Sequence, residues 1–234
     1  MQVDRVRKSN DAHVIETTNS AVTQAYLWMA TGLIVTGLVA AYTAKSPMAM
    51  TVLFANKINF ILMSMGEIAL VAYLVTRLQS LTAAKARGLF LAFSVLNGMM
   101  FSTVFLAYTR FDISRAFLVA ALMFGVMSAY GNFTRRDLTS WGSFLTLGLF
   151  GILIASVANF LLHSPVVQWV ACCCGVIVFS GLAAYDTQKI KRMAFEAADD
   201  ETLNKISILG ALMIYLDMIN LLLVLLELTA GKRR

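Results

Sequence analysis

Three carboxylates stand in or at the end of long apolar stretches of this sequence: Glu67, Asp186 and Asp217. A charged side chain at the centre of a bilayer costs at least a few kcal/mol, so an ionisable group there is a functional candidate. Carboxylate oxygens take up protons and ligate hard cations such as calcium. The three residues therefore indicate proton or cation chemistry. A structural role, in which a neutral or ion-paired acid holds helices together, stays open for each.

Asp217 makes the sharpest case because its neighbours follow helical spacing. Gly210, Ile214, Asp217, Asn220 and Val224 share one face of a helix, and the opposite side is rich in leucine. An intramembrane carboxylate faces protein or a water-filled cavity rather than lipid. The spacing therefore predicts that the last apolar helix brings Asp217 and Asn220 to the centre of a helical bundle.

The composition is that of a helical membrane protein. Of the 234 residues, 59% are hydrophobic and 14% are charged, whereas a soluble domain carries about 25% charged residues. Lys and Arg lie in short clusters between apolar runs, so the net charge of +6 predicts topology anchors and no nucleic-acid partner. The apolar runs lack the alternation of barrel strands and are long enough for helices that span a lipid bilayer.

Seven stretches are long enough to cross a membrane, and we expect an all-α membrane protein with seven transmembrane helices. The predicted spans are about 24–44, 58–76, 88–109, 114–133, 142–161, 166–186 and 206–228. A polar cytoplasmic tail over residues 1–20 precedes a single transmembrane domain, 21–234. With the N-terminus in the cytoplasm, 12 Lys and Arg lie inside and 7 outside, which favours this orientation. Whether the last helix crosses fully or re-enters stays open.

Small residues mark one predicted packing face. Ala121, Gly125 and Ala129 recur every four residues, a spacing that lets two membrane helices approach closely. We therefore expect this side of the fourth predicted helix to pack against a neighbour.

Two motifs near the end of the chain are specific when they occur together. Residues Gly181–Ile190 read GLAAYDTQKI, and residues Tyr215–Leu221 read YLDMINL. With the order of spans from about residue 20, they make the chain similar to the Bax inhibitor family, the transmembrane Bax inhibitor motif proteins, nearest to their proteobacterial inner-membrane branch. The resemblance implies a central last helix wrapped by the other six. It also implies a pH-sensitive calcium leak in the inner membrane, with calcium as permeant ion, no cofactor and no enzymatic activity.

The resemblance also implies roles for single residues. In that family, two aspartates that match Asp186 and Asp217 share a proton, sense pH and gate the path, and calcium binds them transiently. Glu67 matches a family carboxylate on the second helix, and Arg77 is the nearest basic gating partner. Independently of the family, Asn220 offers a further oxygen for a hard cation on the face of Asp217. The chemistry agrees, because two carboxylates close together in a low dielectric cannot both ionise cheaply and titrate as a unit. A proton and a calcium ion then compete for the same oxygens.

The predicted boundaries leave the two aspartates at different depths. Asp186 ends the sixth span near its cytoplasmic side. Asp217 lies 11 residues into the seventh span, about 17 Å deep at 1.5 Å per residue. The two side chains meet only if the sixth helix continues past its apparent end or the first turns of the seventh project into the cytoplasm.

The serious alternative is a non-enzymatic modulator of a membrane-bound ATP-dependent protease, a link that the resemblance to bacterial members implies. The polar tail would be the place for such docking. An intramembrane aspartyl protease is disfavoured because Ile214–Leu216 precede Asp217 in place of Gly-x-Gly. Zinc hydrolysis is disfavoured because the chain has only His13 and His163, and there is no glycine-rich loop for a nucleotide.

Overall fold

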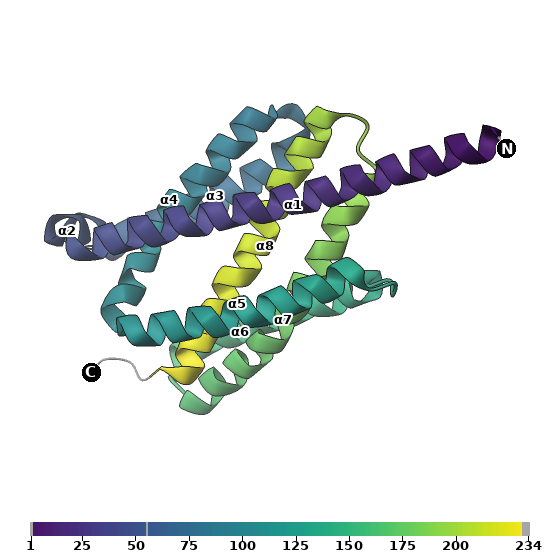
Figure 1. Ribbon diagram of the computed structural model, residues 1–234. Coiled ribbons are helices and arrows are strands. Elements are labelled where there is room, and N and C mark those ends of the chain that lie inside the picture. Colours follow the sequence, from purple (N-terminus) through teal and green to yellow (C-terminus); the bar gives the residue numbers. More distant parts are fainter. Residues whose placement is uncertain (1, 55, 231–234) are drawn as a thin grey trace. The chain divides into compact units, whose positions relative to one another are not determined.

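The computed structural model describes the backbone of residues 2–54 and 56–230 and the side chains of residues 18–54, 56 and 58–230. The elements in chain order are α1 (Gln2–Lys45), α2 (Pro47–Phe54), α3 (Lys57–Arg77), the 3₁₀ helix η1 (Leu78–Ser80), α4 (Ala83–Ala107), α5 (Arg110–Phe133), α6 (Thr139–Leu162), α7 (Pro165–Phe195) and α8 (Asp200–Thr229) (Figure 1). This part of the chain has no strand, which confirms the predicted all-α class. Lys232, Arg233 and Arg234, three of the seven Lys and Arg residues counted on the outside, lie beyond the described residues.

Seven helices of the described chain are long and apolar enough to cross a membrane, as predicted. The spans are Thr18–Lys45, Ile58–Ser80, Ala83–Ala107, Arg110–Phe133, Thr139–Leu162, Pro165–Phe195 and Asp200–Thr229. In the apolar centre of α8, 67% of the residues are buried, against 44% for α7 and less for the others. This burial is compatible with a central last helix. Because α8 is one unbroken helix of 30 residues, about 45 Å long, it has the length that a full crossing requires.

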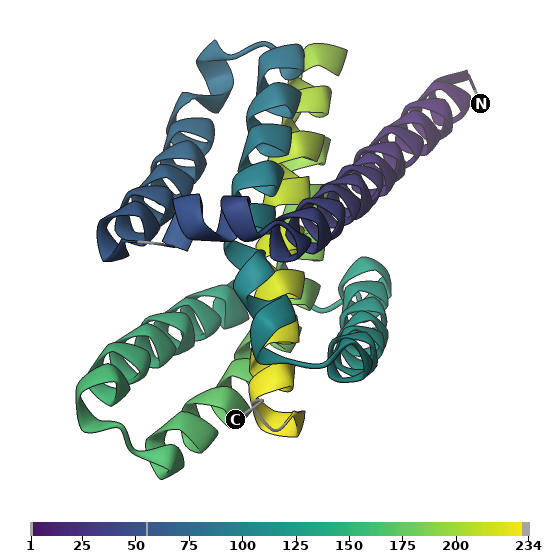
Figure 2. The same ribbon diagram turned by 90° about the vertical axis from the view of Figure 1, so that its left-hand side faces the viewer.

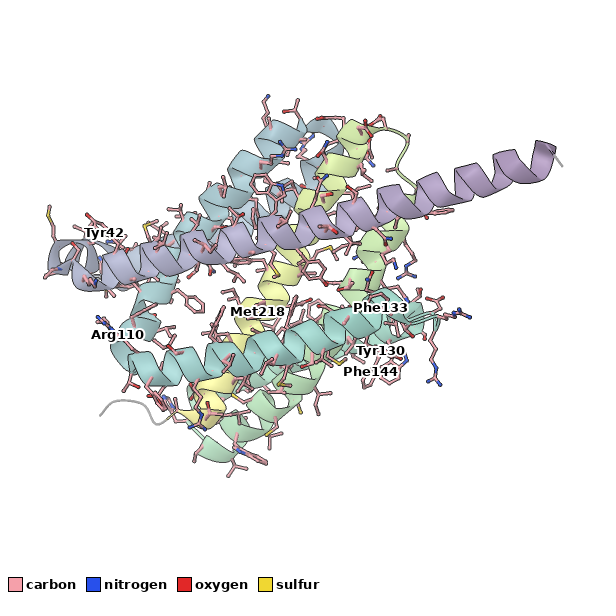
Figure 3. The ribbon with its side chains drawn as sticks, in the orientation of Figure 1. Tyr42, Arg110, Tyr130, Phe133, Phe144 and Met218 are labelled. Carbon is pink, nitrogen blue, oxygen red and sulfur yellow. The ribbon has the colours of Figure 1, made fainter. Side chains whose placement is uncertain are left out.

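Large apolar side chains cover the outside of the helices. Phe133 on α5 is 80% exposed and Phe144 on α6 is 63% exposed; both are labelled in Figure 3. A soluble monomer rarely exposes so many large apolar groups together. The surface is therefore one that lipid covers, in agreement with the composition.

The residues fall into two compact units, and the first combines the chain up to Thr103 with Lys189–Met213. Within it, α1 and α4 pack closely. Thr36 Oγ1 donates to the carbonyl of Ser94 at 2.9 Å, and a Cβ at Gly98 would lie 2.8 Å from the carbonyl oxygen of Thr36. Small and hydroxyl-bearing residues thus allow the two backbones to approach, as is common between membrane helices.

In the same unit, α4 lies beside the N-terminal half of α8 (Figure 2). The guanidinium of Arg87 donates to Asn204 Oδ1 at 3.1 Å. The backbone N–H of Ala83 donates to Glu201 Oε1 at 2.6 Å. Polar side chains of α8 therefore fix the first turns of α4, where backbone donors have no partner within their own helix.

The second unit combines Val104–Gln188 with the chain from Ile214 onward. Within it, α5 lies directly against the backbone of α7 at Gly131. A Cβ at this position would lie 2.8 Å from Cα of Ala184 and would overlap the carbonyl oxygen of that residue. Only glycine allows this approach, so Gly131 sets how closely α5 packs on α7.

The prediction that Ala121, Gly125 and Ala129 form the packing face of α5 is wrong. Gly125 and Ala129 are exposed, and a Cβ at Gly125 would meet nothing within 4 Å. The buried stripe is the neighbouring one, formed by Ala116, Ala120, Phe124, Ser128 and Gly131. A spacing of four fits two adjacent stripes of a helix equally well, and the position of Gly131 selects the second.

The first turn of α8 has an N-terminal cap, and its titration gives a prediction. The N–H of Thr202 donates to Asp199 Oδ1 at 2.6 Å, and this hydrogen bond is the main reason why the pKa of Asp199 lies below its usual value. A lowered folded-state pKa means that the stabilisation is present above the usual aspartate pKa of about 3.9 and is lost as pH falls through the lowered value. We expect Asp199→Ala to lower the thermal midpoint at pH 7, and the difference from wild type to become smaller in strong acid, where the protonated carboxyl is a weaker acceptor. Asp199→Asn, which still caps, should retain the midpoint, and equal losses for both variants would contradict the cap.

Candidate functional site

The face of α8 that carries Asp217 packs against α7. In the second unit, a Cβ at Gly175 of α7 would lie 2.9 Å from Val224 Cγ1. In the first unit, a Cβ at Gly210 of α8 would lie 2.7 Å from Ile190 Cγ1. Gly210, Asp217 and Val224 share one helical face, so the predicted inward face of α8 is the one that looks onto α7.

The facing stripe of α7 contains Asp186. Residues spaced by three and four from the contact at Gly175 form this stripe: Phe179, Leu182, Asp186 and Ile190. The contact of Gly175 with Val224 also sets the antiparallel register within the second unit. Asp186 lies eleven residues after Gly175 and Asp217 lies seven residues before Val224, a difference of four residues. The two aspartates are therefore about one turn apart along the axis, or about 5 Å.

The lengths of α7 and α8 explain why Asp186 and Asp217 lie at similar depths. The hydropathy pattern places the end of the sixth span at about residue 186, but α7 continues to Phe195. It also places the start of the last span at about 206, but α8 begins at Asp200. Both helices extend beyond their apolar segments. The two aspartates can therefore lie at similar depths although the predicted spans place them about 17 Å apart.

Both carboxylates are buried. Asp186 is 8% exposed and Asp217 is 5% exposed, and each takes part in interactions with other groups of the protein. Burying two ionised carboxylates is costly unless they are hydrogen-bonded, paired or ligated. Two acids on facing stripes at similar depth can lower this cost by sharing a proton or by ligating a cation between them.

Asn220 lies one turn beyond Asp217 on α8 and is half-buried. Its Nδ2 donates to the carbonyl of Leu216 at 2.8 Å. The amide nitrogen thus bonds to the helix itself, and Oδ1 is the atom suited to a cation ligand.

The other two predicted site residues belong to the first unit. Glu67 on α3 is half-buried and hydrogen-bonds with Asn97, and its buried Oε1 accepts no hydrogen bond from the residues that the structure describes. Arg77 is the last residue of α3, and its side chain is exposed. The structure thus places Asp186, Asp217 and Asn220 in one unit, while the roles of Glu67 and Arg77 stay predictions.

One partly buried polar contact, between Tyr108 and Glu227, has no counterpart in the sequence predictions. Tyr108 Oη donates to Glu227 Oε2 at 2.8 Å, and burial, together with this bond, raises the pKa of Tyr108. Glu227 stands near the end of the last predicted span, so a charge count along that span could have found it. The contact fixes the chain between α4 and α5 to the C-terminal end of α8.

The described residues offer no preformed metal site. Among them, no group of three or more His, Cys, Asp and Glu side chains is placed to hold a metal ion.

Comparison with known proteins identifies the family. A family model described as "Inhibitor of apoptosis-promoting Bax1" matches residues 18–234. The inner membrane protein YbhL of Escherichia coli (strain K12) is 44% identical over 212 residues, which cover 90% of this chain and 91% of that protein. A Rickettsia prowazekii protein, RP147, is 37% identical over 90% of this chain and 89% of its own length, and a Borreliella burgdorferi protein is 35% identical over 92% and 93%. With the seven spanning helices, these matches show that the chain is a multi-pass membrane protein that belongs to the Bax inhibitor family.

Proposed function

We propose that this protein is a pH-sensitive calcium leak of the bacterial inner membrane, gated by Asp186 and Asp217. The observation that carries the proposal is that both acids are buried, at 8% and 5% exposure, on the stripes of α7 and α8 that face each other. The inner membrane is proposed from the name of the Escherichia coli relative. The protein acts without an enzymatic step, and calcium is its permeant ion.

The gate works by competition for oxygen atoms. When the pair holds its shared proton, the charge that attracts a divalent cation is reduced. When the proton leaves, the carboxylates and the Asn220 amide oxygen offer hard ligands that suit calcium. The pair titrates as one unit, so a change of pH moves the whole site between two states.

Purified protein in liposomes that contain a calcium-sensitive dye tests the function. We expect calcium entry above that of empty liposomes, with one clear transition when external pH is scanned. Liposomes with the Asp217→Asn variant serve as the matched control, because asparagine retains the size of aspartate and removes the charge. Calcium entry equal to that of empty liposomes at every pH would overturn the proposal.

Arg77 gives a second test of gating. A cation that pairs with an ionised carboxylate offsets the negative charge that would attract calcium, and in the proposed mechanism Arg77 holds the closed state in this way. We expect Arg77→Ala to raise the basal calcium leak several-fold and Arg77→Lys, which keeps the charge, to stay near wild type. The measurement is the initial rate of dye response at equal protein content. A leak in Arg77→Ala that equals or falls below wild type would contradict this role.

A further inference from the structure

Two buried hydroxyls in the second unit have no hydrogen-bond partner among the residues that the structure describes: those of Ser128 on α5 and Ser180 on α7. Ser128 is 5% exposed and Ser180 is 7% exposed. A serine within a membrane helix usually bonds to the carbonyl four residues earlier, as Ser94 does with Phe90 at 2.9 Å. Each buried polar group without a partner in its protein requires a physical explanation.

The two serines lie at the same level of neighbouring helices. α5 and α7 touch at Gly131 and Ala184. Beyond the end of α5, the carboxamide of Gln188 accepts from the N–H of Leu138 at 2.8 Å, so the two helices run in the same direction. Ser128 is three residues before Gly131 and Ser180 is four residues before Ala184. Helical spacing then puts both hydroxyls on the facing stripes, one turn from the closest approach.

The same level of α7 lies close to Asp217. In the register set by Gly175 and Val224, Ser180 lies opposite position 219 of α8. That is two residues from Asp217, or about 3 Å along the axis. The two hydroxyls and the carboxylate therefore form one polar layer, at nearly the same level along the helices of the second unit.

We propose that Ser128 and Ser180 together bind an internal water molecule that bridges α5 and α7 and hydrates the ion path beside Asp217. A water molecule in a protein interior needs two or more polar partners, and two hydroxyls supply both donors and acceptors. This water site extends the hydrated part of the ion path from the contact between α7 and α8 to the side of α7 that faces α5. This inference rests on the proposed calcium leak for its role, but the water itself can be tested independently of flux.

Thiol accessibility tests the water directly. In full-length protein with Cys172, Cys173 and Cys174 changed to alanine, Ser128→Cys and Ser180→Cys each place a thiol of nearly the same size at the site. A small, charged methanethiosulfonate reagent reaches such a thiol only through water. Ser94→Cys is the matched control, because Ser94 is fully buried and its hydroxyl bonds to its own helix. We expect the thiols at 128 and 180 to react at least tenfold faster than the thiol at 94.

Flux supplies the second arm. The double variant Ser128→Ala with Ser180→Ala should lower calcium entry several-fold and keep the pH of the transition, because the aspartates are untouched, whereas Ser94→Ala should keep both. Equal reaction rates at all three thiols would overturn the water site, whatever the flux. If wild-type protein conducts no calcium, the proposed leak fails, while fast labelling at 128 and 180 would still support the water site.

Discussion

Changing Asp186 or Asp217 to asparagine is expected to remove the same pH transition from calcium flux. The two acids are buried on facing stripes of α7 and α8, about one turn apart, and a shared proton belongs to both. Removing either carboxylate ends the sharing and the repulsion between like charges. The single variants and the double variant should therefore show nearly the same flat profile when liposome flux is scanned against pH.

Non-additivity is the quantity that decides this prediction. Residues that act as a unit show coupling of about 0.5–3 kcal/mol in double-mutant cycles, and here the coupling should lie toward the upper end. Glu227→Gln is a matched control on the same helix, since glutamine can still accept the hydrogen bond of Tyr108, and it should retain the transition. Thermal midpoints of all variants should stay close to wild type. Two separate, additive shifts would mean that the aspartates titrate independently, and gating would then have to rest on Glu67 and Asp217.

The sequence carries enough information for the orientation of Asp217 because helical periodicity is a local property. The spacing of Gly210, Asp217 and Val224 predicts one shared inward face. The structure confirms that face, since Gly210 contacts Ile190 and Val224 contacts Gly175. The same periodicity predicts the helical class, because every backbone group in lipid must be paired within its own segment.

The ends of α7 and α8 could not be predicted in the same way. Hydropathy marks where apolar residues stop, whereas a helix continues as long as its backbone is paired and its side chains tolerate helical geometry. Lys189, Lys191 and Arg192 end the apolar run but have long, unbranched side chains that favour helix. α7 therefore continues to Phe195, and the depth mismatch between the aspartates comes from this difference.

Features of one helix that depend on the position of a neighbouring helix could not be predicted from the sequence either. The stripe of Gly125 and the stripe of Gly131 on α5 both contain small residues at helical spacing, and only the position of α7 distinguishes them. The facing of Ser128 and Ser180 depends on the same contact. A single helix shows which residues share a face, but the neighbouring helix decides which face is buried.

Alanine at Gly131 is therefore expected to destabilise the protein, and alanine at Gly125 of the same helix is the matched control. A Cβ at position 131 would lie 2.8 Å from Cα of Ala184 and would overlap its carbonyl oxygen. These are backbone atoms, so they cannot turn away as a flexible side chain would. Forcing extra volume into a packed contact costs about 1–3 kcal/mol, and Gly131→Ala should lower the thermal midpoint in detergent and separate α5 from α7.

Gly125→Ala should act in the opposite direction. A Cβ at position 125 meets nothing within 4 Å, and alanine is favoured over glycine inside a helix by about 1 kcal/mol. Thermal unfolding followed by helical circular dichroism should therefore rank Gly125→Ala at or above wild type and Gly131→Ala below it. Because Ser128 and Ser180 lie one turn from the Gly131 contact, Gly131→Ala should also lower calcium flux, which Gly125→Ala should leave unchanged. Equal stability of the two variants would mean that the α5–α7 contact does not determine the packing of the second unit, and the polar layer beside Asp217 would lose its structural basis.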